Sequence, residues 1–62
     1  MKKTSEYNVL KQELVCTVSL INSIEKRLQF TNEEKLIDSL SYELLAQRAR
    51  YGYLLDKLKS QR

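Results

Sequence analysis

Few residues in this chain of 62 have the side chains that catalysis or metal binding requires. Glu34 and Asp38, one helical turn apart, form the one notable pair of carboxylates, the kind of pair that general acid and base catalysis uses. Cys16 is the only cysteine and histidine is absent, so a structural zinc site and a histidine general base are both excluded. No phosphate-binding glycine loop or nucleophile motif occurs. The sequence therefore predicts a protein that is not an enzyme and has no cofactor.

The elements that must position these residues are helices. Proline is absent, Gly52 is the single glycine, and leucine, lysine, glutamate, glutamine and arginine dominate, which favours helix over strand. Apolar residues recur at intervals of three and four in both halves of the chain. No apolar run approaches the length of a membrane span. A lone cysteine is typical of a reducing compartment, so we expect a cytoplasmic protein.

The stretch QFTNEEKL separates the two periodic halves. Thr31 followed by Glu34 is the pattern of a capping box, which predicts one helix over about residues 5–29, a turn at 30–31 and a second helix over about 32–60. A link this short forces the helices to lie antiparallel. We therefore predict an all-α, two-helix hairpin that forms a single domain over residues 1–62.

The two apolar stripes form the predicted seam, the line along which the helices pack. In an antiparallel hairpin with this loop, the residue numbers of two facing residues should sum to 61. By this rule each residue of the first stripe faces a residue of the second stripe. Thr17 and Gln47 are polar breaks in this seam, and we predict that they fix its alignment at some expense of stability. Arg50 is expected to reach Glu13 on the facing helix. The predicted seam consists of Tyr7, Leu10, Leu14, Thr17, Ile21, Ile24, Ile37, Leu40, Leu44, Gln47, Tyr51 and Leu54.

Many other apolar residues lie outside this seam and need cover. One flank is narrower and holds Val15, Val18, Leu45 and Leu55. The broader flank is predicted to pack against its own copy, giving a homodimer and a four-helix bundle, the common arrangement for short helical hairpins. The alternative is that these residues are scattered on the surface, since much of any folded surface is apolar. The candidate dimer face is Val9, Cys16, Leu20, Leu36, Ala46 and Tyr53.

Charge distinguishes the two ends of the predicted hairpin. Eight cations and three carboxylates lie at the open end, where the chain termini meet, which leaves +5; three cations and five carboxylates lie at the loop end, which leaves −2, and the two sum to the net charge of +3. The basic end could contact nucleic-acid phosphates or an acidic protein. Alternatively it is a solvated face that complements the helix dipoles. Its cations are Lys2, Lys3, Lys11, Arg48, Arg50, Lys57, Lys59 and Arg62.

The second half, LIDSLSYELLAQRARYGYLLDKLK, resembles the YaaL-like family, small helical proteins of Gram-positive spore formers. That family reads LID, YEL, an alanine, RY and YLL followed by a lysine, and here these are residues 36–38, 42–44, Ala46, 50–51, 53–55 and Lys59. The resemblance implies a small helical protein without an assigned biochemical activity. With the pattern above, it leads us to expect an interaction module that binds a protein partner. The rival is a nucleic-acid-binding accessory that uses the basic end.

A second resemblance is to the small aspartyl-phosphate phosphatases of sporulation, which are also helical hairpins. Their motif is Ser-Gln-Glu-Leu-Asp early in the second helix, where this chain reads Ser41, Tyr42, Glu43, Leu44 and Leu45. The aspartate of the motif is therefore replaced by Leu45. This resemblance implies at most a degenerate relative, so the activity is not carried over.

Overall fold

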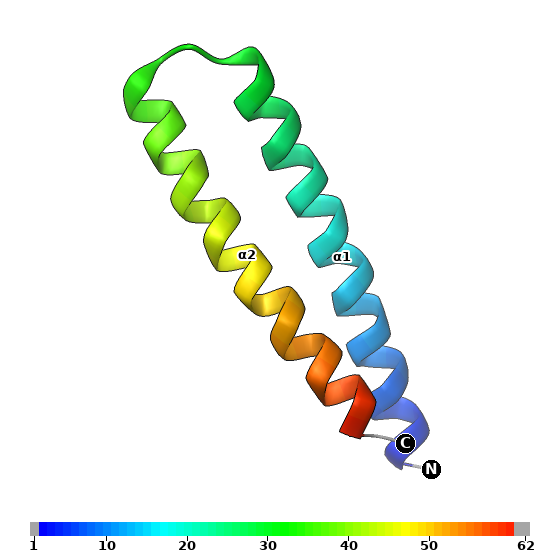
Figure 1. The fold of residues 1–62 in the computed structure, drawn as a ribbon. Helices are drawn as coiled ribbons and strands as arrows, with labels where there is room; N and C mark the ends of the chain where they lie inside the picture. The colour runs from blue at the N-terminus through cyan, green and yellow to red at the C-terminus, as the bar shows by residue number, and fades with distance from the viewer. Residues whose placement is uncertain (1, 61–62) are drawn as a thin grey trace.

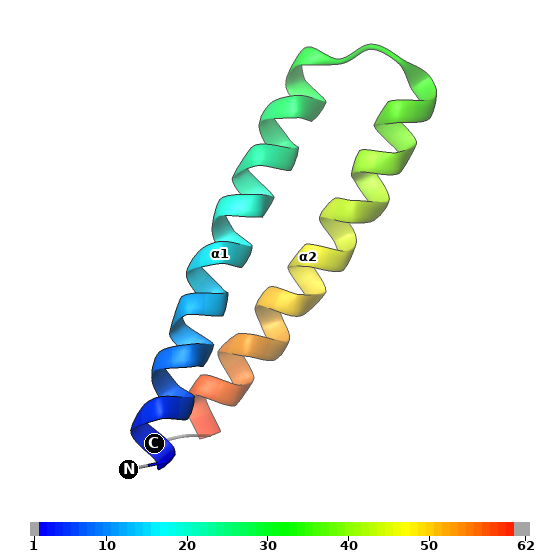
Figure 2. The same cartoon turned by 180° about the vertical axis from the view of Figure 1, so that it is seen from behind.

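The computed structural model describes the backbone of residues 2–60 and the side chains of residues 6–60. These residues form two antiparallel helices, α1 (Lys2–Phe30) and α2 (Glu34–Ser60), which lie side by side along their whole length (Figures 1 and 2). The molecule measures 48 × 14 × 12 Å. Neither of the two helices is long and apolar enough to cross a membrane. The predicted all-α hairpin is therefore confirmed.

The loop is longer than the sequence predicted, because the capping box does not form. The Glu33 carbonyl accepts the first helical hydrogen bond, from the Ile37 amide at 2.9 Å, so Glu33 and not Thr31 caps α2. The Thr31 hydroxyl oxygen accepts from the Glu33 amide at 3.4 Å, a local turn within the loop. The loop thus spans residues 31–33 instead of 30–31. Phe30 ends α1 and Glu34 begins α2, so these two residues lie at about the same height at the loop end. Their residue numbers sum to 64, and two residues at the same height further along the hairpin therefore also sum to about 64, not to the predicted 61.

The core of this hairpin is small. Among the described residues, the hydrophobic side chains that are fully buried are Ile24, Leu40 and Leu54. Ten of the twelve residues predicted for the seam are buried or half-buried. Tyr7 and Tyr51 are the exceptions, 42% and 36% exposed.

The accessible surface also shows that the hairpin is poorly covered. It amounts to 5243 Å², whereas a folded monomer of 7.3 kDa typically exposes about 4,200 Å². The excess of about 1,000 Å² is similar to the area of about 800 Å² that each partner buries in a standard protein interface. The elongated two-helix shape thus leaves much of the chain in contact with solvent.

Gly52 is a position where one substitution is expected to stabilise the protein. It lies inside α2, and a Cβ atom added there would have nothing within 4 Å. Because glycine in a helix interior costs about 1 kcal/mol relative to alanine, Gly52→Ala should raise the melting temperature by roughly 4–8 °C. Thermal unfolding followed by circular dichroism measures this shift. A lower melting temperature would mean that another backbone approaches Gly52 closely in solution.

Candidate interaction surface

One side of the hairpin, here called flank A, exposes the predicted dimer face. We define flank A as Val9, Cys16 and Leu20 of α1 together with Ala46 and Tyr53 of α2. All five are exposed; Val9 is 54%, Leu20 50% and Tyr53 59% accessible. The sixth predicted member, Leu36, is half-buried and points closer to the seam. Their exposure agrees with the predicted position outside the seam, Leu36 in part excepted, whereas their role as a dimer face stays a prediction.

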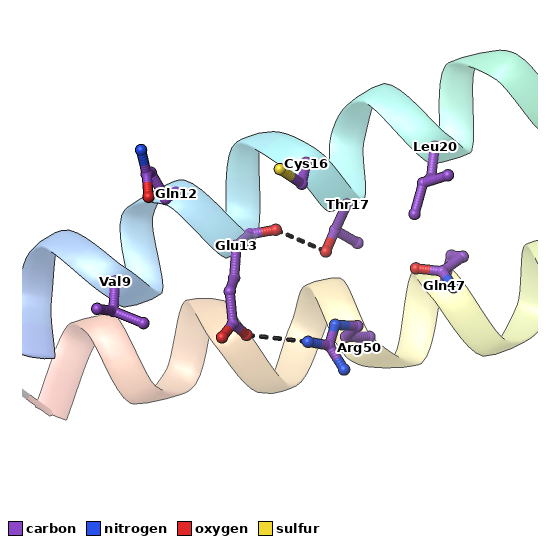
Figure 3. A pocket seen from close by; sticks show the side chains of 8 residues that line it. All are labelled: Val9, Gln12, Glu13, Cys16, Thr17, Leu20, Gln47 and Arg50. Carbon is purple, nitrogen blue, oxygen red and sulfur yellow. Dashed lines mark hydrogen bonds and ion pairs between the residues drawn. The ribbon is translucent and has the colours of Figure 1, made fainter.

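An open groove of about 500 Å³ runs along flank A at mid-length (Figure 3). Both helices contribute to its walls, and the apolar side chains come from α1. Its lining consists of Val9, Gln12, Glu13, Cys16, Thr17, Leu20, Gln47 and Arg50.

An ion pair crosses this groove from one helix to the other. The Arg50 guanidinium donates to Glu13 Oε1 at 2.9 Å, as the sequence predicted (Figure 3). Both side chains are about half exposed, so the pair contributes only about 0.2–1 kcal/mol to stability. Arg50 thus places a charged side chain on the α2 side of the groove, beside the apolar residues of α1.

The two polar seam residues lie at the base of the groove and differ in their hydrogen bonding. The Thr17 hydroxyl is 2% exposed and donates to the Glu13 carbonyl, one turn earlier in the same helix, at 2.7 Å. Gln47 is half-buried, and its Oε1 is buried without a hydrogen-bond donor. An unpaired buried acceptor of this kind costs about 1–3 kcal/mol. Thr17 is thus accommodated in the seam, whereas the Gln47 amide oxygen lies there without a donor among the described residues.

The opposite side, flank B, has a second groove of about 470 Å³ between Val18 and Ile21 of α1 and Arg48 and Tyr51 of α2. A second ion pair lies on this side, where the Arg48 guanidinium donates to Glu25 Oε2 at 3.0 Å. Flank B also includes the exposed Val15 and Leu45, which are 66% and 63% accessible.

The candidate basic patch is partly neutralised within the chain. Arg48 and Arg50 both pair with glutamates of α1, and Arg48 thereby reaches Glu25, which the sequence assigned to the acidic loop end. Two lysines instead lie over tyrosine rings of their own helix, Lys11 over Tyr7 at 5.7 Å and Lys57 over Tyr53 at 5.9 Å. The side chains of Lys2 and Lys3 and all of Arg62 lie outside the described residues, while Lys59 lines a shallow pocket with Tyr7, Leu55 and Leu58.

The carboxylates Glu34 and Asp38 are both exposed at the start of α2. Over residues 6–60, no group of three acidic or cysteine side chains is arranged to hold a metal ion. Two aromatic residues outside the predicted seam and flanks are the most exposed of the large hydrophobic side chains among the described residues: Phe30 at 86% and Tyr42 at 75%. Both are large apolar residues that do not fall on the three-and-four spacing of the seam, and this mismatch is the sequence feature from which their exposure could have been predicted.

Comparison with protein family models, with curated proteins and with solved structures gives no match for this chain.

Proposed function

We propose that this protein is a helical-hairpin interaction module that binds a protein partner through flank A, and that its first partner is a second copy of itself. The observation that carries the proposal is the exposed apolar side of α1 next to a groove of about 500 Å³. An exposed apolar strip on a chain with so small a core is typical of a surface that another helix covers.

The energetics support a second copy on flank A. Full burial of an apolar side chain contributes about 1.5–3 kcal/mol, and Val9, Leu20 and Tyr53 are about half exposed, so covering each contributes roughly half of that, besides the smaller Cys16 and Ala46. Several such contacts on both sides can exceed the entropic cost of association. Cys16 and Ala46 are small, so they allow the helices to approach closely in the middle of the strip.

The proposal includes the cytoplasm as the compartment and assigns no catalytic role. The single cysteine supports a reducing compartment, since Cys16 has no disulfide partner in its own chain. The exposed Glu34 and Asp38 support electrostatics at a helix N-terminus rather than catalysis, because carboxylates there interact favourably with the helix dipole. The YaaL-like resemblance is compatible with this function and adds no activity to it.

Ala46→Glu tests the proposal, because it places a charge in the middle of the interface. We expect the wild type to sediment as a dimer at micromolar concentration and Ala46→Glu to weaken dimerisation at least tenfold. Ala49→Glu is the matched control: it adds the same charge one turn away, at an exposed position outside flank A, and should leave the dimer intact. Equal effects of the two substitutions would contradict the assignment of flank A.

Cys16 provides an independent readout on the unmodified protein. Its thiol is exposed in a single hairpin, so only an interface can protect it from thiol reagents. We expect slow labelling in the native dimer and fast labelling on dilution or in denaturant. A wild type that sediments as a monomer, with Cys16 reacting at the rate of a free thiol, would refute both the dimer and the chosen flank.

The rival function, nucleic-acid binding by the open end, rests on the basic patch. Tight binding of generic DNA or RNA that falls steeply with salt would favour it, since that slope reports the number of phosphate contacts. The pairing of Arg48 and Arg50 with glutamates supports the protein partner, because the two carboxylates offset part of the positive charge that a phosphate backbone would meet.

A further inference from the structure

We propose that the open end of flank B binds an acidic segment of a protein partner, through one apolar side chain of that segment and the carboxylates beside it. The site is a shallow pocket of about 210 Å³ at the end where α1 begins and α2 ends (Figure 1), lined by Tyr7, Leu55, Leu58 and Lys59. This inference goes beyond the proposed function and does not depend on it, because the pocket shares no residue with flank A.

The pocket lies on the same side of the hairpin as the groove of flank B. Residues seven apart share one side of a helix, so Lys11 lies on the side of Val18, and Leu55 lies on the side of Arg48. Val18 and Arg48 both line the flank B groove. A second copy that covers flank A therefore leaves the pocket accessible to another protein.

The lining of the pocket is mostly apolar. Leu55 and Leu58 are half-buried and Tyr7 is 42% exposed, so each leaves apolar surface in contact with water. Pockets that hold small molecules typically measure about 300–1,000 Å³. The pocket here, of about 210 Å³, is smaller and accommodates one large apolar side chain presented by a partner.

Two lysines border this apolar surface, and no ion pair with a described residue offsets their charge. Lys59 lines the pocket, and Lys11 Nζ lies over the Tyr7 ring, 5.7 Å from its centroid. Arg48 and Arg50, by contrast, both pair with glutamates. The helix dipole accounts for a cation in the last turn of α2, but not for Lys11, which lies well inside α1. The two lysines therefore complement carboxylates beside the apolar side chain of a partner.

The tyrosines at this end favour a protein segment over a nucleic acid. Proteins that hold single strands without reading their sequence stack the bases on exposed aromatic rings. Here Lys11 lies over the Tyr7 ring at 5.7 Å and Lys57 over the Tyr53 ring at 5.9 Å, so each ring already has a cation against it. The leucines offer nothing to a phosphate but can cover an apolar side chain. An acidic segment thus matches both parts of the site, whereas a nucleic acid matches only the lysines.

Fluorescence anisotropy with a labelled synthetic peptide of repeated Leu-Glu-Glu units tests the proposal on the full chain. We expect the wild type to bind this peptide, and to bind a Ser-Glu-Glu peptide of equal charge about tenfold more weakly, because serine leaves the apolar surface uncovered. Equal affinity for both peptides would overturn the proposal, since charge alone would then account for binding. Absence of binding of the Leu-Glu-Glu peptide at micromolar concentration would overturn it as well.

Charge reversal determines whether the peptide binds at the pocket. The double substitution Lys11→Glu and Lys59→Glu should weaken binding of the Leu-Glu-Glu peptide about tenfold. Lys26→Glu with Lys35→Glu is the matched control, the same change in net charge at the loop end, and should alter binding by about twofold at most. All four lysines are exposed, so circular dichroism should show unchanged helix. Equal losses in the two variants would mean that binding follows net charge and would refute the site.

Two further measurements separate this site from a nucleic-acid site and from flank A. Single-stranded DNA that binds more tightly than the Leu-Glu-Glu peptide and displaces it would overturn the choice of a protein partner. Ala46→Glu, which tests flank A, should leave peptide binding unchanged, because residue 46 does not line the pocket. A monomeric wild type that binds the peptide refutes the proposed dimer and supports this site. Loss of peptide binding in Ala46→Glu refutes the position of the site outside flank A.

Discussion

Replacing Leu54 by aspartate is expected to unfold the protein. Leu54 is 2% exposed and is one of the three fully buried hydrophobic side chains among the described residues. An aspartate there would place a carboxylate between the two helices without a partner, at a cost of several kcal/mol. A hairpin of this size has only a few kcal/mol of stability to lose. Far-UV circular dichroism should show the loss of helix at a temperature where the wild type is folded.

Leu45→Asp is the control for this experiment. It makes the same chemical change in the same helix, but Leu45 is 63% exposed, so the carboxylate stays in water and the helix should persist. Leu14 and Ile21, which the sequence placed in the seam, are only half-buried, so aspartate at either should destabilise less than at Leu54. Retained helicity in Leu54→Asp would mean that the helices do not pack on the described seam.

Gln47→Leu is expected to stabilise the protein. The substitution removes the buried Oε1 that lacks a donor and replaces the amide with an apolar group in the seam. Relief of an unpaired acceptor is worth about 1–3 kcal/mol, and each kcal/mol raises the melting temperature of a domain this small by roughly 4–8 °C. Thr17→Val should add little, because the Thr17 hydroxyl already donates within its own helix. The double variant should therefore melt close to Gln47→Leu.

Gln29→Leu controls for the general effect of exchanging glutamine for leucine in a helix. Gln29 is exposed near the end of α1, so its substitution should change the melting temperature by much less. A lower melting temperature for Gln47→Leu alone would show that the amide has a hydrogen-bond donor in solution, supplied by a second chain or by water.

The sequence predicted the parts of this fold that follow from periodicity. The spacing of Leu40, Leu54 and Ile24 marks one side of each helix, and a chain without proline has only one short interruption in which to turn. The reach from Arg50 to Glu13 followed from the same reasoning, since both lie at the same height on one side of the seam. The outward position of the α1 part of flank A followed from the same periodicity.

The parts that the sequence did not predict depend on how individual side chains and turn residues compete. Thr31 is a good cap by type, yet its hydroxyl bonds within the loop and Glu33 caps the helix instead. Because the second helix begins later than predicted, the residue numbers of two residues at the same height sum to about 64 instead of 61. Tyr7 and Tyr51 fit the period, yet they are 42% and 36% exposed, because a seam only two helices wide covers a large side chain on few sides. The pair between Arg48 and Glu25 is offset along the hairpin, since their numbers sum to 73, and pairing by height therefore did not predict it.

The two cross-helix ion pairs also limit rotation of the helices about their own axes. An apolar seam between two smooth helices resists separation more than it resists rolling, because leucine side chains contact one another over a range of angles. Arg48 and Arg50 are two residues apart, about 200° around α2, so one binds α1 on flank B and the other on flank A. Rotation of α2 about its own axis, in either direction, lengthens one of the two ion pairs and shortens the other. The two weak pairs on opposite flanks thus favour one angular setting of α2, and that setting decides which side chains face outward.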